Sequence, residues 1–486
     1  MRQQLLFDEE YDYFEQNESV EVRDPAWEYF DKLVVNEALN RAIVSFQANK
    51  KVPVYRWYKF KEGYSTQLVE YCLNYAFESG TEVEEVLDPF SGTGTTVTRS
   101  AEHGYTATGV EILPVANAVT KARIHFHKAN ADIFRQYLSK LRDFDFSQST
   151  GEFIFPHIRI TKGAFSKKTE KALSAFHDFL QTIEDETTRY LFWFAIFTIL
   201  EKVSYTRKDG QYLRWDHRAL RQVKSSFEKS KVYEFEPALF EKLDQMLNDI
   251  VHHQEKERNL GEVNLIEGSS LRKLTELPDN TFDIIITSPP YCNRYDYTRT
   301  YALELAYMGY NDEAVKSLRQ ELLSATVENK SKYDELYEFY QQQNKLSEFQ
   351  HVEHVFSSNV LLNEALEFLE VKSKKGELNN KNVVSMVYNY FFEMCFIIKD
   401  ISKALASNGR VFMVNDNVQY AGQAIPVDFI LSNFAHEFGL EVEKIWVLPN
   451  GKGNSSQQMG KHGRNEIRKC VYIWKKTGDQ GFNGFK

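Results

Sequence analysis

The stretch TSPPYCNRYDYTRTY, residues 287–301, holds the residues best suited to chemistry. Its tetrapeptide Ser288, Pro289, Pro290 and Tyr291 follows a strongly apolar run that predicts a buried strand. Proline has a fixed φ and no amide hydrogen, so two prolines in a row hold the Pro289 carbonyl in one direction. The Pro289 carbonyl oxygen, the Ser288 hydroxyl and the Tyr291 ring are thus expected to lie together at the end of a strand. The alternative is a rigid strand-to-loop corner without a ligand.

A second candidate is the glycine turn in LDPFSGTGTT, residues 87–96. Gly92 and Gly94 stand between an expected strand and an expected helix, where glycine permits positive φ and close approach of a ligand. No Lys follows the second glycine, which excludes a Walker loop, and the third glycine of the dinucleotide motif GxGxxG is missing. Asp88, at the strand end, can accept from a ligand ammonium group. Glu111, which ends the next strand, can accept from both ribose hydroxyls.

A ligand with a ribose and an amine but no phosphate fits S-adenosylmethionine. The alternative for Glu111 is a structural acid beside a helix N-terminus, where the helix dipole favours negative charge.

The elements that position these residues alternate between strand and helix. Because the strands are continuously apolar, we predict a mostly parallel sheet covered on both faces. The fold class is therefore α/β, a doubly wound Rossmann-like sheet with an antiparallel final hairpin and two large helical insertions. The expected strands are 83–90, 105–112, 263–268, 282–288, 409–416, 440–449 and 470–476, and the expected helices are 64–79, 113–142, 383–405 and 426–438.

The pair of motifs, DPF-x-GTGTT followed by a strand-end SPPY, resembles the DNA amino-methyltransferases. This S-adenosylmethionine-dependent family methylates the exocyclic amine of cytosine (N4) or adenine (N6). The resemblance covers roughly residues 51–125, 260–300 and 380–476. It implies direct methyl transfer from the cofactor sulfonium to the amine, with no covalent enzyme intermediate. Cys292 is expected to pack in the core, because a carbon-5 cytosine enzyme needs a Pro-Cys nucleophile and here Tyr291 intervenes.

The tetrapeptide then has a chemical role. An exocyclic amine is conjugated with its ring, so its lone pair is a poor nucleophile until acceptors bind its N–H bonds. The Ser288 hydroxyl and the Pro289 carbonyl can accept these bonds, while Pro290 helps to fix the corner. Tyr291 offers a ring face to the base, and stacking of this kind contributes about 1–3 kcal/mol. The base must first leave the duplex, which costs on the order of a few kcal/mol.

The resemblance also implies a set of cofactor contacts. Segment 55–69 is similar to the segment that closes over the methionine end of the cofactor, and Ser269 stands near the place of an adenine-facing Asp. The complete expected set is Tyr64, Ser65, Asp88, Phe90, Gly92, Gly94, Thr95, Glu111 and Ser269.

Charge is unevenly distributed along a chain whose net charge is −10. Residues 202–231 hold nine bases and three acids, and residues 450–476 hold seven bases and one acid. Phosphates respond to local charge, so both stretches are candidate DNA contacts. The alternative is a pair of solvated surface loops. The residues expected to contact DNA are Arg207, Lys208, Arg214, Arg218, Lys452, Lys461 and Arg464.

The chain has 486 residues, which suggests two or three domains or one domain with large insertions. We predict an acidic N-terminal extension (1–50), a cofactor-binding part (51–144) and a helical insertion that is the candidate target-recognition region (145–260). The catalytic part (261–301), a second helical insertion (302–378) and the C-terminal part of the methyltransferase domain (379–486) follow. The first insertion is favoured for recognition because it is basic.

The sequence gives little support for a metal-binding, disulfide-bonded, secreted or membrane protein. The four cysteines show no CxxC spacing, so neither a metal site nor a disulfide framework is expected. The N-terminus does not read as a signal peptide, and the longest apolar run has 11 residues, so we expect a cytoplasmic protein outside the membrane.

We therefore predict a site-specific enzyme that methylates N4 of cytosine in duplex DNA, with the target base flipped out. Serine before Pro-Pro-Tyr is more usual in the N4-cytosine branch of the family that this chain resembles. N6-adenine methylation and methylation of RNA or tRNA are the alternatives. A non-catalytic DNA-binding subunit is a third, disfavoured by the intact glycines, Glu111 and the tetrapeptide. The resemblance implies a restriction–modification or phage-defence role beside a partner restriction or defence protein.

Overall fold

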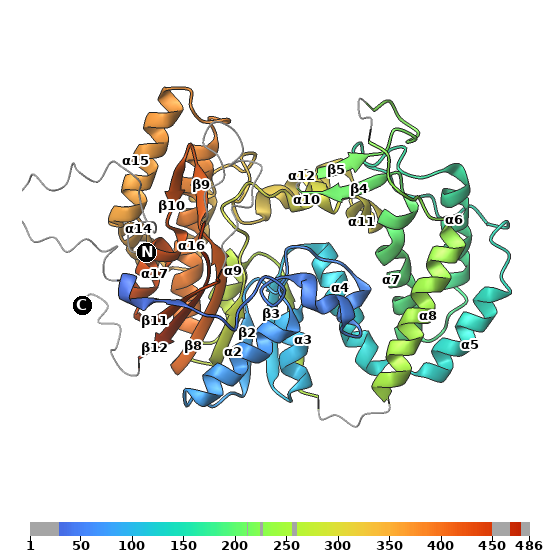
Figure 1. Cartoon of the computed structure of the whole chain (residues 1–486), viewed down its shortest axis with the longest axis horizontal. Coiled ribbons are helices and arrows are strands. Elements are labelled where there is room, and N and C mark those ends of the chain that lie inside the picture. Colours follow the sequence, from blue (N-terminus) through green and yellow to red (C-terminus); the bar gives the residue numbers. More distant parts are fainter. Residues whose placement is uncertain (1–28, 211, 224–226, 255–259, 450–466, 478–486) are drawn as a thin grey trace, which may run out of the picture.

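A computed structural model describes residues 29–210, 212–223, 227–254, 260–449 and 467–477 (Figure 1). Within these residues an eight-stranded sheet has the strand order β1-β11-β12-β8-β7-β2-β3-β6. Its strands are β1 (Leu33–Val35), β2 (Glu85–Asp88), β3 (Thr106–Glu111), β6 (Val263–Glu267), β7 (Phe282–Thr287), β8 (Leu405–Asp416), β11 (Leu440–Val447) and β12 (Lys469–Lys476).

The topology confirms the predicted fold class. The strand pairs are parallel except those of β12, which runs antiparallel to both of its neighbours, β8 and β11. The chain passes from β2 to β3 to β6 in one direction and then places β7 on the other side of β2. The carboxyl ends of β2 and β7 therefore meet at a topological switch point, where open α/β sheets bind their ligands.

The apolar strands are buried on both faces. In β7, Ile284 and Ile286 join the core under α2 (Thr66–Glu78), whereas Ile285 joins the core under α16 (Val383–Ala404). Successive side chains of a strand point to opposite faces, so a continuous apolar run fits a sheet with helices on both sides.

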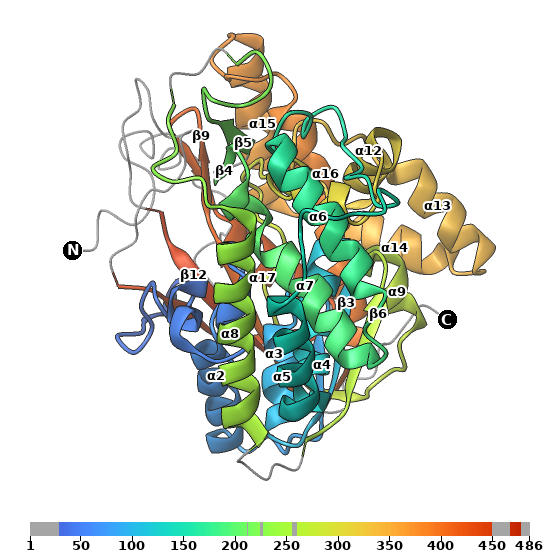
Figure 2. The same cartoon turned by 90° about the vertical axis from the view of Figure 1, so that its right-hand side faces the viewer.

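A bundle of helices covers one end of the sheet and lies to the right in Figure 1. Its central helix α7 is buried on nearly all sides, which explains the apolar run seen in the sequence. Figure 2 shows α6, α7 and α8 beside one another, in agreement with their contacts. No helix within the described ranges is both long and apolar enough to cross a membrane. The bundle helices are α4 (Pro114–Lys128), α5 (Ala131–Arg142), α6 (Lys167–Leu180), α7 (Glu186–Val203) and α8 (Phe235–Gln254).

A second group of helices, α13 to α15, packs on the outer side of α16. Between the two groups, α10 and α11 continue from the stretch that follows β7 and contact the bundle. The domain ranges expected from the sequence stay predictions. The remaining helices are α3 (Thr95–Glu102), α9 (Ser270–Lys273), α10 (Tyr297–Thr300), α11 (Ala302–Tyr307), α12 (Asp312–Glu321), α13 (Tyr333–Gln342), α14 (Leu346–Ser357), α15 (Val360–Lys374) and α17 (Val427–Glu437).

Short elements complete the chain, and among them the hairpin β4–β5 lies at the top of the bundle in Figure 1. They are the hairpins β4 (Thr206–Asp209) with β5 (Tyr212–Trp215) and β9 (Val418–Tyr420) with β10 (Gln423–Ile425), and the 3-10 helices η2 (Phe30–Lys32), η3 (Phe46–Lys51), η4 (Tyr55–Trp57) and η5 (Leu274–Glu276).

Candidate active site

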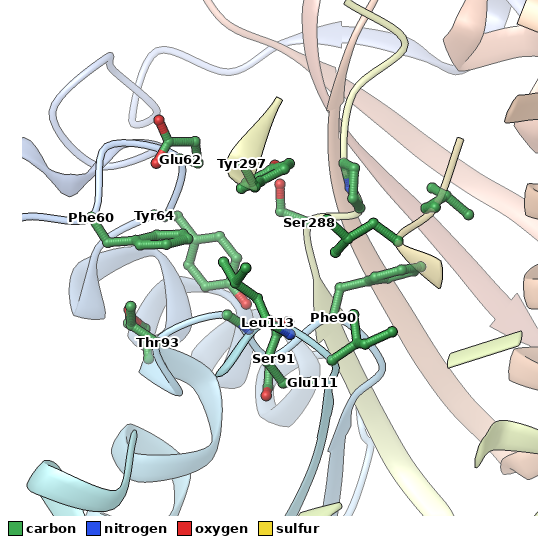
Figure 3. Close-up of a pocket in the computed structure, with 17 residues that line it drawn as sticks. Phe60, Glu62, Tyr64, Phe90, Ser91, Thr93, Glu111, Leu113, Ser288 and Tyr297 are labelled. Carbon is green, nitrogen blue, oxygen red and sulfur yellow. Dashed lines mark hydrogen bonds between the residues drawn. The ribbon is translucent and has the colours of Figure 1, made fainter. Parts of the chain in front are cut away.

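A partly open pocket lies at the carboxyl ends of β2, β3 and β7, at the topological switch point (Figure 3). Five separate segments line it, within residues 60–64, 90–95, 111–113, 288–297 and 322–323. Both motifs singled out in the sequence therefore open onto one space. In Figure 3, Ser288 and Tyr297 lie toward the top of the view and Glu111 toward the bottom.

The two glycines of the turn serve different purposes. Both have positive φ, +52° at Gly92 and +71° at Gly94. A Cβ on Gly94 would stand 2.6 Å from the side chain of Thr120, so this position is needed for close packing of α3 against α4. A Cβ on Gly92 would meet the Phe60 ring and the Phe90 carbonyl oxygen, both at an ordinary 3.9 Å. Gly92 lines the pocket, and its positive φ turns its N–H toward Glu111.

Glu111 faces the pocket from the end of β3. Its Oε2 accepts from the Gly92 N–H at 2.6 Å, and its Oε1 accepts from the Leu113 N–H at 2.7 Å. Burial raises the pKa of Glu111 to about 7, while the backbone N–H groups that it binds work in the opposite direction. The carboxyl group is thus held in a fixed orientation and keeps lone pairs for a ligand's hydroxyl groups.

Asp88 lies behind the pocket wall. It is 1% exposed and accepts from the Tyr64 hydroxyl at 2.9 Å and from the Phe90 N–H at 3.1 Å. Burial raises the pKa of Asp88 to about 6. Tyr64, Phe90 and Thr95 line the pocket themselves, so Asp88 orients two of the residues expected to contact the cofactor.

Two further expected residues lie outside the pocket lining. Ser65 is buried, and its hydroxyl donates to the Ile43 carbonyl at 2.6 Å, away from the pocket. Ser269 is half-buried just before α9, where the neighbouring Ser270 donates its hydroxyl to the Pro89 carbonyl. Contact of Ser269 with adenine stays a prediction.

The tetrapeptide follows β7 directly. Ser288 and Pro290 line the pocket, and Pro289 is buried between them. Tyr291 is half-buried and lies outside the lining, with its hydroxyl 3.3 Å from Ser288 Oγ. Cys292 is fully buried, and its carbonyl accepts from the Tyr420 hydroxyl at 2.7 Å, as expected for a packing residue. The stacking role of Tyr291 stays a prediction.

Sequence reasoning missed several lining residues. Glu62 faces the pocket and accepts from the hydroxyls of Tyr295 and Tyr301. Phe60 stacks on Tyr301 with ring centroids 5.0 Å apart. The resemblance of segment 55–69 to a cofactor-closing segment was a signal for Phe60 and Glu62. Other lining residues that were not predicted individually are Ser91 and Thr93 within the glycine turn, Tyr297 within the stretch 287–301, and Gly63, Ile112, Leu113, Leu322 and Leu323.

The basic stretch forms the hairpin β4–β5. Arg207 and Arg214 are directly opposite each other across the two strands, and both are exposed. Lys208 points to the other face, where it is 6% exposed and pairs with Glu304 of α11. Its Nζ also lies 2.9 Å from the hydroxyl of Tyr58. The expectation that Lys208 contacts DNA is therefore corrected, because strand alternation turns this charge into the protein.

The Arg218 side chain is exposed, but its guanidinium already binds other groups of the protein. It forms a two-pronged ion pair with the buried Asp216, at 2.8 and 2.7 Å, and donates to the Lys229 carbonyl. The Arg218 hydrogen bonds hold the pKa of Asp216 well below its usual range. The other three expected DNA contacts, Lys452, Lys461 and Arg464, lie outside the described residues.

The sheet with its antiparallel β12, and a pocket that joins a glycine turn to the SPPY corner, define a Rossmann-like methyltransferase. No family model matches the chain. It is 42% identical over 455 residues to the type II methyltransferases M.AvaI of Nostoc sp. and of Anabaena variabilis, covering 92% of this chain and 91% of each relative. It is 39% identical over 457 residues to the type II methyltransferase M.BsoBI of Geobacillus stearothermophilus, covering 90% of this chain and 89% of the relative.

The chain belongs to the type II DNA methyltransferases, enzymes that methylate DNA in restriction–modification systems. This family implies S-adenosylmethionine as the methyl donor, in agreement with the inference from the glycine turn and Glu111.

Proposed function

We propose that the chain transfers a methyl group from S-adenosylmethionine to the exocyclic N4 amine of cytosine in duplex DNA. The observation that carries the proposal is the single pocket shared by Glu111 and Gly92 at one end and by Ser288 and Pro290 at the other. The choice of N4 of cytosine is based on serine before Pro-Pro-Tyr, which is more usual in that branch of the family.

The pocket residues fit the cofactor chemically. Glu111, oriented by two backbone N–H groups, would accept from the ribose hydroxyls. Tyr64 and Phe90 supply apolar walls. When bound, S-adenosylmethionine supplies a methyl group made electrophilic by a positively charged sulfur.

The chain's own residues prepare the acceptor. The Ser288 hydroxyl and the Pro289 carbonyl would accept the two N–H bonds of the target amine and draw the nitrogen lone pair out of conjugation. The Ser288 hydroxyl donates to Tyr291 Oη at 3.3 Å, which leaves the lone pairs of Ser288 Oγ for the amine. Tyr291 would stack on the extruded base and offset part of the cost of flipping.

DNA would approach from the side of the hairpin β4–β5. Arg207 and Arg214 stand side by side on its exposed face, and the Arg214 guanidinium lies 4.5 Å from the centre of the Phe227 ring. The Arg214 guanidinium also pairs with Asp209 at 3.1 Å, an exposed ion pair that a DNA phosphate would replace. Arg218, Lys452, Lys461 and Arg464 are proposed as further contacts. A restriction endonuclease of the same specificity is the proposed functional partner.

The test is incubation of the full-length protein with plasmid DNA and labelled S-adenosylmethionine, followed by mass spectrometry of the nucleosides. The expected product is N4-methylcytosine. N6-methyladenine would replace the proposal with the adenine alternative, and methyl transfer to structured RNA but not to plasmid would refute a DNA substrate. A Ser288→Ala variant is the matched control, because it removes one amine acceptor and leaves Glu111 in place.

A further inference from the structure

Arg123 on α4 is a buried cation directly behind the glycine turn. It is 2% exposed. Its Nη1 donates to Thr95 Oγ1 at 3.2 Å and its Nη2 donates to Thr93 Oγ1 at 3.4 Å. The guanidinium lies 4.3 Å from the centre of the Tyr55 ring, and its Nε has no hydrogen-bond partner among the described residues. A buried charge is costly. Burial lowers the pKa of Arg123, whereas the charge of Glu102 on α3 raises this pKa and offsets part of that cost. The hydrogen bonds from its Nη1 and Nη2 go to two neutral hydroxyls.

The hydrogen bonds from Arg123 determine how the hydroxyl groups of Thr93 and Thr95 can bind a ligand. A threonine hydroxyl has one proton to donate and two lone pairs that accept. Because Arg123 occupies a lone pair on Thr93 and on Thr95, each hydroxyl proton must point elsewhere. Thr93 and Thr95 both line the pocket, and Figure 3 shows Thr93 on the side of Phe60. The arrangement therefore leaves two O–H groups able to donate to a ligand in the pocket, with a positive charge behind them.

The other charges in the pocket limit which chemical group of a ligand can bind at Thr93 and Thr95. Glu111 and Glu62 are both acidic and face the same space, which disfavours a phosphate and suits hydroxyl groups and cations. The Thr93–Thr95 wall favours an anion, and α3 begins at this point, so its helix dipole adds to the preference. Burial lowers the pKa of Arg123 to about 10, so the guanidinium stays charged at neutral pH.

We propose that Arg123 is a positioning residue that makes Thr93 and Thr95 the binding site for the α-carboxylate of the cofactor's methionine end. The inference rests on the proposed function, because that carboxylate is the one anionic group of S-adenosylmethionine. Arg123 does not touch the cofactor; it sets the direction of two hydroxyl protons and supplies the compensating charge.

The test compares two ligands that differ by that carboxylate. Isothermal titration of the full-length protein would use S-adenosylmethionine and decarboxylated S-adenosylmethionine, which keeps the adenosine, the sulfonium and the amine. The wild-type protein is expected to prefer the carboxylated ligand by roughly tenfold to a hundredfold, the range of a charge-assisted hydrogen bond. Arg123→Met is expected to lose this preference, with weaker binding of S-adenosylmethionine and nearly unchanged binding of the decarboxylated compound.

The controls separate this role from a general effect on folding. Arg142→Met makes the same change at an exposed arginine paired with Asp244 and should keep the preference. Should Arg123→Met fail to fold, the double variant Thr93→Val with Thr95→Val removes the two donors and should lose the preference in the same way. A parallel loss of affinity for both ligands would overturn the role of Arg123, as would equal wild-type affinity for both. Failure of the wild-type protein to bind either compound would overturn the proposed function as well.

Discussion

Asp88 and Glu111 end neighbouring parallel strands, yet their carboxyl groups have different surroundings. Asp88 is turned to Tyr64 and the Phe90 N–H behind the pocket wall, whereas Glu111 faces the pocket between two backbone N–H groups. Their position after a strand was visible in the sequence. The direction of each side chain was not, because it depends on the turn that follows each strand.

Cofactor binding is expected to depend on pH through Glu111. Burial holds its pKa at about 7 in the free protein, and hydroxyl donors from a ribose would lower the pKa in the complex. Binding then favours the ionised form, so affinity should be constant above about pH 8 and fall below about pH 7, by at most tenfold per pH unit. Calorimetric titrations between pH 5.5 and 8.5 would measure this profile.

Asp88, with its pKa raised to about 6, titrates in an overlapping range. The variant Glu111→Gln distinguishes the contributions of the two acids. It should bind the cofactor more weakly, and its affinity should no longer change with pH near pH 7. An affinity that rises as the pH falls would contradict the assignment of Glu111 to the ribose.

Replacement of Tyr291 by alanine is expected to lower methyl transfer by roughly 5- to 150-fold and to leave cofactor affinity within about a factor of two. The reason is that Tyr291 lies outside the lining of the pocket, whereas loss of base stacking costs about 1–3 kcal/mol and leaves the base unheld. Turnover and calorimetry on the same preparation would measure both quantities. Tyr291→Phe keeps the ring and should retain most of the activity. Equal losses of transfer and of cofactor binding would contradict the proposed role.

At the level of elements, the hairpin β4–β5 shows that a count of charged residues does not tell which of them are exposed. The stretch 202–231 is rich in bases, and Arg207 and Arg214 are exposed as its composition suggested. Lys208 is adjacent to Arg207 in the chain but points inward, to Glu304. Strand alternation could have separated the two side chains once a hairpin was recognised. The partner of Lys208 lies 96 positions along the chain, and such pairing cannot be read from one sequence.

The buried pair Lys208–Glu304 is expected to matter for stability. Lys208→Met and Glu304→Gln should each lower the free energy of unfolding by about 3–5 kcal/mol, because each leaves a buried partner without its counter-charge. The double variant should lose less than the sum of the two, since no uncompensated charge remains. Urea denaturation of the three variants would measure this. Additive losses would show that the two side chains do not interact in the folded protein.

The exposed face of the hairpin leads to a separate expectation for DNA binding. Arg207→Ala with Arg214→Ala should weaken binding to duplexes of any sequence and reduce the slope of log K against log salt by up to about 1.8, near 0.9 for each phosphate that is no longer neutralised. Fluorescence anisotropy over a range of salt concentrations measures the slope. Arg142→Ala, on a distant face of the bundle, is the control and should leave the slope unchanged. A wild-type slope in the double variant would place the DNA elsewhere.

For the molecule as a whole, the sequence indicated seven of the eight strands of the described sheet, all except β1, and four of the five segments that line the pocket. Alternating strands and helices predicted the doubly wound sheet, and the glycine turn, Glu111 and SPPY corner do meet in one space. The pair Leu322–Leu323 could not be predicted, because it reaches the pocket from a segment whose helical pattern indicates only a surface or a bundle, whereas Tyr297 lies within the stretch 287–301 that the sequence had indicated. The placement of Leu322–Leu323 depends on packing between elements distant in the sequence.

The same packing predicts how the protein responds to its cofactor. Phe60 and Leu113 of the pocket belong to the hydrophobic core that also contains Phe194 of α7, so pocket and bundle should unfold together. A ligand at a hundred times its Kd stabilises the folded state by about 2.7 kcal/mol, which for a chain of this length raises Tm by about 3 °C. Differential scanning calorimetry should show one transition that moves as a unit when S-adenosylmethionine is added. Tyr291→Ala should keep the shift and Glu111→Gln should reduce it. Two transitions, of which only one responds to the cofactor, would show that the bundle is energetically separate from the site.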